Sequence, residues 1–279
     1  MKKILLAIDA TNVNTNSLDF ACFLGKLTKS KITGVFLENR VAEEKPVLKS
    51  MQGAVDVDWT VDENSEEHKV KTETIKKNIA FFTEGCINRE TCYEVHHDGG
   101  VPSSELIEES RFADAVIVDA ETALNDHFEA IPTTFIKDVL KKAECPVIIA
   151  PENFETIDQI VFTYNGSSSS VFAIKQFTYL FPELKEKKVT IIQVNETGEW
   201  LDKDKNKFME WLQDHYKNLR FEAVKGKTEN VLFDHLFKRK NMFLVMGAYG
   251  RTSLSRFFKR SHADLLINTV TQPIFIAHR

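Results

Sequence analysis

The chain repeats one pattern of apolar strands, and this internal repeat limits its fold more than any other feature. Residues 3–9 read KILLAID and residues 158–165 read DQIVFTYN, so each has a polar entry, an apolar run and a final Asp or Asn. Residues 143–150 (AECPVIIA) and 270–277 (VTQPIFIA) each open a short apolar strand with a proline, where its missing N–H costs least. We therefore interpret residues 1–152 and 153–279 as two copies of one domain.

Apolar runs alternate with helical patterns in the same order in both copies. The apolar runs cover 4–8, 32–37, 92–95, 115–118 and 147–150, and then 160–163, 189–194, 221–224, 243–246 and 274–277. This alternation predicts an α/β fold: two tandem Rossmann-like domains, each a five-stranded parallel sheet of order 3-2-1-4-5 flanked by helices. The joint at 151–154 (PENF) has no Gly/Ser linker. We therefore expect the copies to pack side by side, with the last strand of each at their interface.

The two copies differ in length, mainly after the second strand of the first copy. Residues 4–146 span 142 positions and residues 160–273 span 113, a difference of 29 that falls mostly in residues 39–66. This segment is acidic and weakly periodic. A plain surface loop is the favoured interpretation, and a short extra strand or a segment that packs on a partner is the alternative.

Composition excludes several classes of protein. No apolar run approaches the ~18 residues of a membrane-spanning helix, and the short run after Lys3 is interrupted by Asp9, which favours a buried strand over a signal peptide. We therefore expect a cytoplasmic protein with no membrane partner. The net charge of −5 gives no reason to expect nucleic acid. Residues 1–152 contain 17 Lys and Arg against 27 Asp and Glu, whereas residues 153–279 contain 19 against 14, so the second copy is the better host for an anionic ligand.

Candidate ligand residues gather where the strand order reverses, beyond the first and fourth strands of the second copy. The fourth strand runs into Gly247 and Gly250, which let backbone N–H groups approach a phosphate, and Arg251 follows them. The first strand ends in Asn165, followed by Gly166 and four serines, one of which is expected to cap the next helix.

Here the chain resembles the universal stress protein family, which carries G-x2-G-x9-G-[S/T] after strand four as a nucleotide-phosphate loop. Gly247, Gly250 and Ser261 match that pattern, whereas Arg260 replaces its third glycine, and either contacts phosphate or blocks the pocket. The family's Asp at the end of strand one is Asn165 here, which keeps hydrogen bonding and loses the charge. The resemblance covers the whole second copy, and the first copy by its architecture and its first and last strands.

The resemblance implies a regulatory, stress-response protein that binds ATP or a related adenine nucleotide, with Mg²⁺, in its second domain. The alternative is a pseudo-dimeric scaffold that binds proteins and no nucleotide; a further homodimer through edge strands is compatible with both. No catalytic motif is present, so we expect at most weak ATP hydrolysis and no catalytic residue. The candidate ligand-binding residues are Asn165, Val194, Gly247, Gly250, Arg251, Arg260 and Ser261.

The first copy lacks the glycine loop. Its fourth strand is followed by Asp119, Ala120 and Glu121, and Asp9 ends its first strand. Three acids in one crevice would repel a polyphosphate, so we interpret this site as a solvated loop that binds no nucleotide; a Mg²⁺ site is the alternative. In residues 92–98 (CYEVHHD), a strand leading into a polar loop is favoured over a zinc site.

Overall fold

The computed structural model describes residues 1–40, 45–51, 54–125, 129, 131–226, 228–247 and 271–277. The first half contains β1 (Lys3–Asp9), α1 (Thr15–Thr28), β2 (Lys31–Asn39), β3 (Lys45–Met51), β4 (Ala54–Thr60), α2 (Glu66–Asn88), β5 (Tyr93–Gly100), α3 (Pro102–Ser110), β6 (Ala115–Val118), α4 (Thr134–Lys142) and β7 (Val147–Ile149). The second contains β8 (Gln159–Tyr164), α5 (Ser168–Leu180), the 3-10 turn η2 (Pro182–Leu184), β9 (Lys188–Asn195), α6 (Asp202–Leu212), β10 (Asn218–Lys225), α7 (Thr228–Phe237), β11 (Met242–Gly247) and β12 (Ile274–Ala277).

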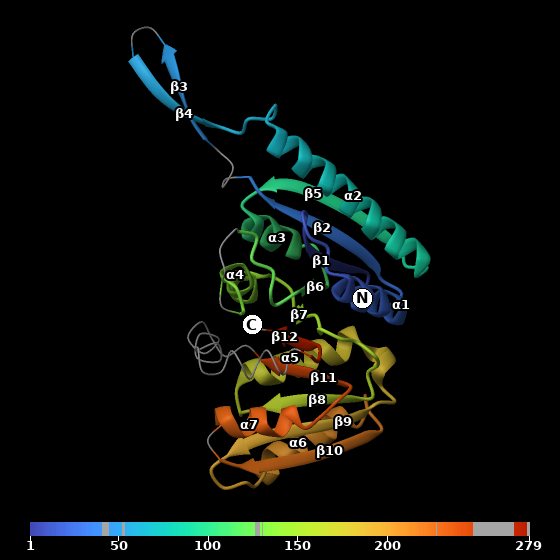
Figure 1. Ribbon diagram of the computed structural model, residues 1–279. Coiled ribbons are helices and arrows are strands. Elements are labelled where there is room, and N and C mark those ends of the chain that lie inside the picture. Colours follow the sequence, from blue (N-terminus) through green and yellow to red (C-terminus); the bar gives the residue numbers. More distant parts are fainter. Residues whose placement is uncertain are drawn as a thin grey trace.

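Ten of these strands form one sheet, in the order β10-β9-β8-β11-β12-β7-β6-β1-β2-β5 (Figure 1). Each half contributes five strands that pair in parallel, with its first strand between its second and its fourth. The predicted α/β class and the order 3-2-1-4-5 are therefore confirmed in both halves.

The strands are apolar on both sides because helices cover both faces of the sheet. In β1, Ile4, Leu6 and Ile8 point into one core, whereas Leu5 and Ala7 point into the other. Side chains of α1, α2, α5 and α6 complete the first core, and those of α3, α4 and α7 complete the second. Successive side chains of a strand point to opposite faces of the sheet, so this single strand contributes to both cores.

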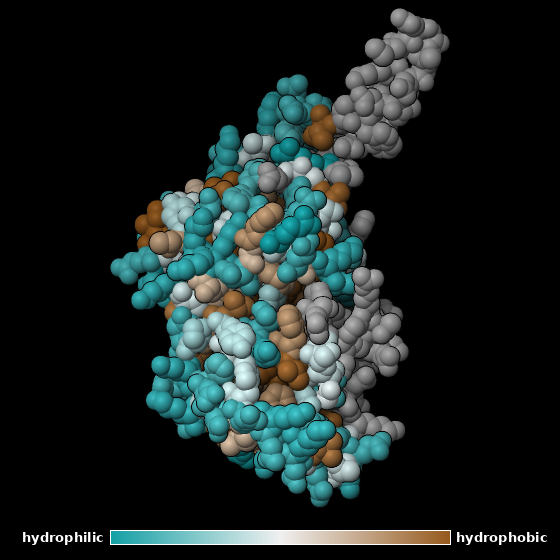
Figure 2. Space-filling model, turned by 180° about the vertical axis from the view of Figure 1, so that it is seen from behind, coloured by the Kyte–Doolittle hydropathy of each residue, from teal (hydrophilic) through white to brown (hydrophobic). Residues whose placement is uncertain are grey.

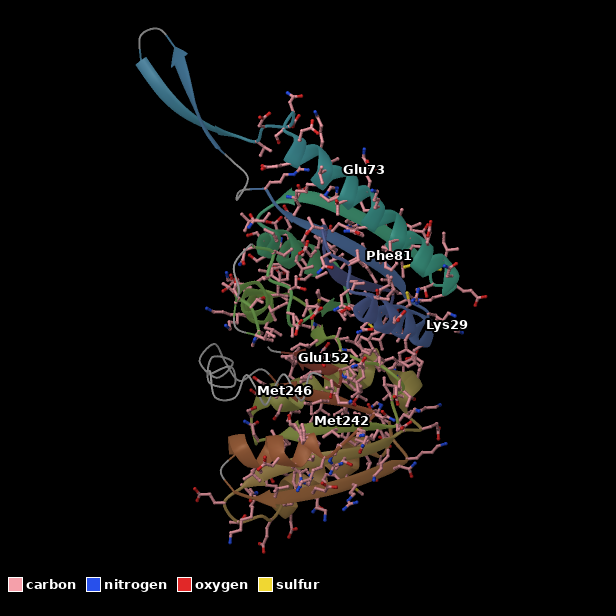
Figure 3. All side chains as sticks on the ribbon, viewed as in Figure 1. Lys29, Glu73, Phe81, Glu152, Met242 and Met246 are labelled. Carbon is pink, nitrogen blue, oxygen red and sulfur yellow. The ribbon has the colours of Figure 1, made fainter. Side chains whose placement is uncertain are left out.

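The two halves are joined by their last strands. Strand β7 pairs antiparallel with β12 through three residue pairs, from Ile149–Ile274 to Val147–Ile276. Aromatic side chains reinforce this junction, since the ring of Phe20 in α1 lies 6.1 Å from that of Phe243 in β11. Glu152 lies beside it in Figure 3, and its carbonyl accepts a hydrogen bond from the Asn16 side chain. The expectation that each copy's last strand contributes to the interface is confirmed.

The longer connection of the first half is a β-hairpin, which corrects the favoured interpretation of a plain surface loop. Strands β3 and β4 pair antiparallel from Lys45–Thr60 to Met51–Ala54 and form a separate two-stranded sheet. The hairpin projects away from the ten-stranded sheet (Figure 1). The chain lengthens here because residues 39–66 contain two additional strands, which weak periodicity did not reveal.

The face of the molecule seen in Figure 2 is mainly hydrophilic. Figure 2 shows polar residues over most of one face, with hydrophobic residues in small separated patches. Among the described helices, none combines the length and the apolar character needed to cross a membrane.

The end of β11 packs directly on the beginning of α5. A Cβ atom added at Gly247 would lie 2.5 Å from the carbonyl carbon and oxygen of Ser169 and 2.5 Å from the backbone nitrogen of Ser170. Backbone atoms in a helix cannot move aside as the end of a flexible side chain can. Only glycine therefore permits this close contact between strand and helix.

We expect the substitution Gly247→Ala to lower the free energy of unfolding by about 1–3 kcal/mol, as is typical of added atoms in a closed contact. Urea denaturation followed by circular dichroism measures this change. Ser168→Ala, an exposed position in the same turn of α5, is the control and should shift stability by no more than about 0.5 kcal/mol. Equal stability of Gly247→Ala and the control would contradict the contact.

A second substitution tests the aromatic packing at the junction. Phe275 is fully buried in β12, with its ring centroid 5.3 Å from that of Phe177. Phe275→Ala should cost about 3–5 kcal/mol through lost burial and a residual cavity, measured by the same urea titration. Phe112→Ala, where the ring is 75% exposed, should leave stability nearly unchanged. If both variants unfold at the urea concentration of the unmodified chain, the aromatic contacts do not hold the junction.

Candidate functional site

The predicted ligand crevice of the second half lies where β8 and β11 end side by side. These strands are neighbours with Val245 in register with Phe162. Asn165 follows β8, and Gly247 ends β11 against the first turn of α5. The structure therefore brings Asn165 and Gly247 to one edge of the sheet, as the sequence predicted.

The turn between β8 and α5 is organised by short hydrogen bonds. The Asn165 Oδ1 atom accepts a hydrogen bond from the backbone N–H of Ser167 at 3.1 Å. The Ser167 hydroxyl caps α5 by accepting from the backbone N–H of Ser170, also at 3.1 Å. Gly166 has a φ of +84°, and none of the residues that the structure describes lies within 4 Å of where its Cβ would be. An open turn thus leads to a helix N-terminus, whose backbone N–H groups favour an anion.

Two of the predicted residues have a structural role that the sequence did not indicate. Gly247 makes room for the α5 backbone, so packing alone accounts for this glycine. Val194 is 8% exposed and belongs to the core that α7 covers. A role for either residue in contacting a ligand stays a prediction.

The other predicted residues fall in a segment whose placement is not described. This part of the chain, residues 248–270, contains Gly250, Arg251, Arg260 and Ser261. The question whether Arg260 contacts phosphate or blocks the pocket therefore stays open.

The equivalent crevice of the first half is acidic. Asp9, Asp119 and Glu121 line one cavity of about 310 Å³, which also has the side chains of Asn12 and Asn14 in its wall. The prediction that three acids share this crevice is confirmed.

Hydrogen bonds from neighbouring residues stabilise the carboxylates of this crevice and offset part of their mutual repulsion. Asp9 Oδ1 accepts from the Thr11 hydroxyl at 2.7 Å and from its N–H at 2.8 Å. Asp119 accepts from the side chain of Asn14 and, at 3.0 Å, from the backbone N–H of Glu121. Partial burial, followed by the charges of Asp119 and Glu152, raises the pKa of the Glu121 carboxyl above its usual value. The crevice already disfavours negative charge, so a polyphosphate would be repelled.

The alternatives that invoke metal ions gain no support from the described residues. Within them, no group of three His, Cys, Asp or Glu side chains is placed to hold a metal ion. His96 Nδ1 lies 2.8 Å from Glu109 Oε1, whereas His97 Nε2 lies 3.3 Å from Glu38 Oε2. Residues 93–100 form the edge strand β5, so the polar loop expected here is instead a continuation of the strand. The two neighbouring histidines on it take separate acidic partners.

The sequence did not indicate a cavity between α5 and α6. It has a volume of about 340 Å³ and is lined by Tyr164, Val171, Ile174, Lys175, Asp204, Lys207, Phe208 and Trp211. The sequence signal for this cavity is the spacing of its lining residues. They are three or four residues apart on each helix, at 171 and 175 on α5 and at 204, 208 and 211 on α6, so they share one helix face. The same spacing is typical of ordinary core packing, so it did not single out a cavity.

Comparison with known proteins relates the chain to one fold. No family model matches it, and no curated protein does. Among solved structures, a universal stress protein from Archaeoglobus fulgidus is 16% identical with a TM-score of 0.70, over 99% of this chain and 98% of its own. A putative universal stress protein from Pseudomonas aeruginosa is 14% identical with a TM-score of 0.56, over 100% of this chain and 93% of its own.

A third structure, a Pseudomonas aeruginosa protein of unknown function, is also 14% identical with a TM-score of 0.56, over 100% of this chain and 92% of its own. At this level of identity the likeness concerns the fold. Because it extends over both halves, it includes the tandem arrangement of two α/β units. The chain therefore has the tandem fold of the universal stress proteins.

Proposed function

We propose that this chain is a regulatory protein of the universal stress type whose second half binds an adenine nucleotide, ATP with Mg²⁺, beyond β8 and β11. Its main activity is binding, and we expect at most slow hydrolysis because the sequence carries no recognised catalytic motif. The nucleotide would occupy the point where the strand order reverses, which is the usual ligand position in an open parallel sheet.

The observation that carries this proposal is the difference between two equivalent crevices. In the first half, three carboxylates line the cavity. In the second half, the corresponding turn consists of Asn165, Gly166 and serines, and it leads to the capped N-terminus of α5. The same fold thus presents a negative crevice in the first half and a crevice suited to anions in the second. The net charge agrees, because residues 1–152 are net negative and residues 153–279 are net positive.

The described residues of this crevice can contact the ribose and one phosphate of a nucleotide. The amide of Asn165 can donate to a ribose hydroxyl, and the first-turn N–H groups of α5 can favour a phosphate. We assign the remaining phosphate contacts to Gly250, Arg251, Arg260 and Ser261 on the strength of the sequence resemblance. Mg²⁺ would be held chiefly by the phosphates themselves, as this ion commonly is.

A second candidate function is supported by the junction of the two halves. The antiparallel pair β7–β12 makes the chain a pseudo-dimer, and the projecting β3–β4 hairpin is an additional element of the first half. A scaffold that binds proteins would use these features without a nucleotide. The outer strands β5 and β10 of the ten-stranded sheet also offer edges for a homodimer.

Thermal unfolding separates the two candidates. Nucleotide that binds the folded chain at about 100 times its dissociation constant adds roughly 2.7 kcal/mol of stability, so the melting temperature should rise with ATP and Mg²⁺. Differential scanning calorimetry measures the shift, with inorganic phosphate and Mg²⁺ as the control. An unchanged melting temperature at millimolar ATP would favour the scaffold.

Reversing one charge tests the assigned phosphate contact. Arg260→Glu should weaken ATP binding by about tenfold or more, because a charge-assisted contact is replaced by repulsion. Isothermal titration calorimetry measures the affinity. Lys185→Glu, an exposed residue of the same half that precedes β9 at its amino end, makes the same charge change and should leave binding unaltered. Tighter ATP binding by Arg260→Glu would show that Arg260 blocks the pocket.

A further inference from the structure

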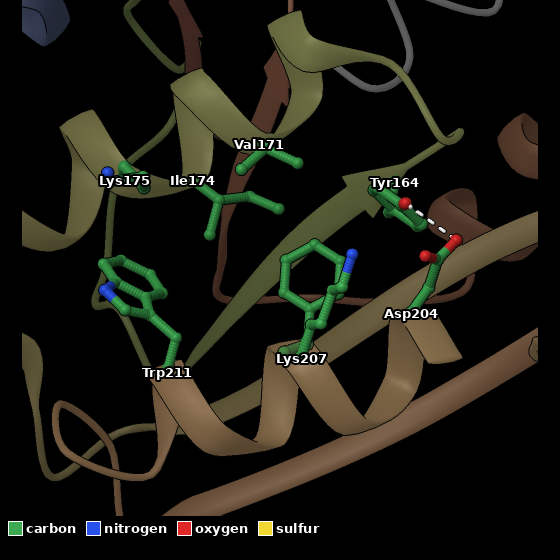
Figure 4. A pocket seen from close by; sticks show the side chains of 8 residues that line it. Tyr164, Val171, Ile174, Lys175, Asp204, Lys207 and Trp211 are labelled. Atoms are coloured by element: carbon green, nitrogen blue, oxygen red, sulfur yellow. Dashed lines mark hydrogen bonds between the residues drawn. The ribbon is translucent and has the colours of Figure 1, made fainter. Parts of the chain in front are cut away.

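The cavity between α5 and α6 has the form of a small-molecule site and lies outside the proposed nucleotide crevice. Its volume of about 340 Å³ falls in the range of roughly 300–1,000 Å³ that is usual for ligand pockets. Side chains from α5 and α6 face one another across it, and Tyr164 closes one end (Figure 4). We call it the α5/α6 pocket.

The interior of the α5/α6 pocket is apolar and aromatic. Ile174 is 1% exposed, and Phe208 and Tyr164 are each 7% exposed, so they form a floor that the core holds in place. Trp211 and Val171 form the walls nearer the surface. A flat apolar group entering here would be covered by rings and branched aliphatic side chains whose positions are already fixed.

The entrance of the α5/α6 pocket is positively charged. Lys175 and Lys207 are exposed, and neither forms an ion pair within the described part of the chain. The Lys175 Nζ atom lies 6.0 Å from the centre of the Trp211 ring. Lys207 reaches from α6 into the space between Trp211 and Tyr164 (Figure 4). One ammonium group thus reaches over the apolar floor, and a second lies at the Trp211 end of the pocket.

The single acid among the residues that line the α5/α6 pocket, Asp204, accepts a hydrogen bond from within the pocket. The Tyr164 hydroxyl donates a hydrogen bond to Asp204 Oδ2 at 3.0 Å. Burial, and then the hydrogen bond and charge of Asp204, raise the pKa of Tyr164 to about 12, so the phenol keeps its proton near neutral pH. Two lysines and one acid line the pocket, so its formal charge is positive, and Asp204 lies at the end where the Tyr164 hydroxyl bonds to it.

We propose that the α5/α6 pocket binds a small aromatic carboxylate. The ring packs on Ile174 and Phe208 beside Trp211, and the carboxylate pairs with the ammonium group of Lys207, while Lys175 adds positive charge at the Trp211 end. A neutral aromatic compound would leave both cations without a counter-charge. A nucleoside triphosphate would bring several negative charges into a pocket that is also lined by Asp204.

The test uses 2-naphthoate, a bicyclic aromatic carboxylate, and its neutral analogue 2-naphthamide, titrated into the full chain by calorimetry. We expect saturable binding of one naphthoate, and binding of naphthamide weaker by roughly tenfold, because each exposed cation contributes modestly. The double variant Lys175→Gln/Lys207→Gln should weaken naphthoate binding by a similar factor. Lys203→Gln/Lys205→Gln removes the same charge from exposed positions of α6 outside the pocket lining and should bind as the unmodified chain does.

A blocking variant and a competitor establish where the probe lies. Val171→Trp changes a residue that is 37% exposed and should fill the pocket and abolish naphthoate binding while the chain stays folded, as circular dichroism would show. ATP with Mg²⁺ should not displace naphthoate. The proposal is overturned by equal affinity for naphthamide, by unchanged affinity in the lysine double variant or in Val171→Trp, by displacement with ATP, or by no saturable binding at millimolar naphthoate.

Discussion

The antiparallel pairing of β7 with β12 is the constraint on which the rest of the structure depends. Both strands are short, and only three residue pairs register across the junction. Their pairing nevertheless turns two five-stranded sheets into one and removes a free edge from each half. Free strand edges are sites of unwanted association, so the tandem chain satisfies within itself a contact that a single copy would leave exposed.

Aromatic side chains on the helices add packing contacts to the short β7–β12 pairing. Phe20 of the first half packs on Phe243 of the second, and it also contacts Phe154 in the connecting segment, with ring centres 5.1 Å apart. Phe177 of α5 contacts rings of both β11 and β12. One apolar cluster therefore runs through both halves, so buried aromatic surface adds to the backbone hydrogen bonds of β7 and β12 in holding them together.

The two crevices differ in charge although the strand order around them is the same in both halves. Asp9 and Asp119 remain in the first half, held by hydrogen bonds from Thr11 and Asn14. The second half has Asn165 and a serine-capped helix at the corresponding place. A parallel sheet supplies the same concave edge in both cases, so the side chains after the strands decide which ligands are accepted.

The sequence by itself determined the class of the fold, the order of the strands and the acidic character of the first crevice. These follow from local signals: apolar runs at a repeated spacing, prolines at strand starts such as Pro146 and Pro273, and acids directly after strands. Each of these signals involves only a few neighbouring residues, so it can be recognised from the sequence alone. They also indicated the joining role of the last strands, because residues 151–154 leave no length for a flexible linker.

Only the tertiary structure decided the remaining features, because each depends on contacts between segments far apart in the chain. The close contact of Gly247 with α5 requires residues 247 and 169 to meet, and a glycine in a sequence does not show whether ligand or backbone fills its space. The β3–β4 hairpin has mixed composition that local patterning does not resolve. The α5/α6 pocket exists because two helices leave room between side chains that, by spacing alone, are indistinguishable from an ordinary core.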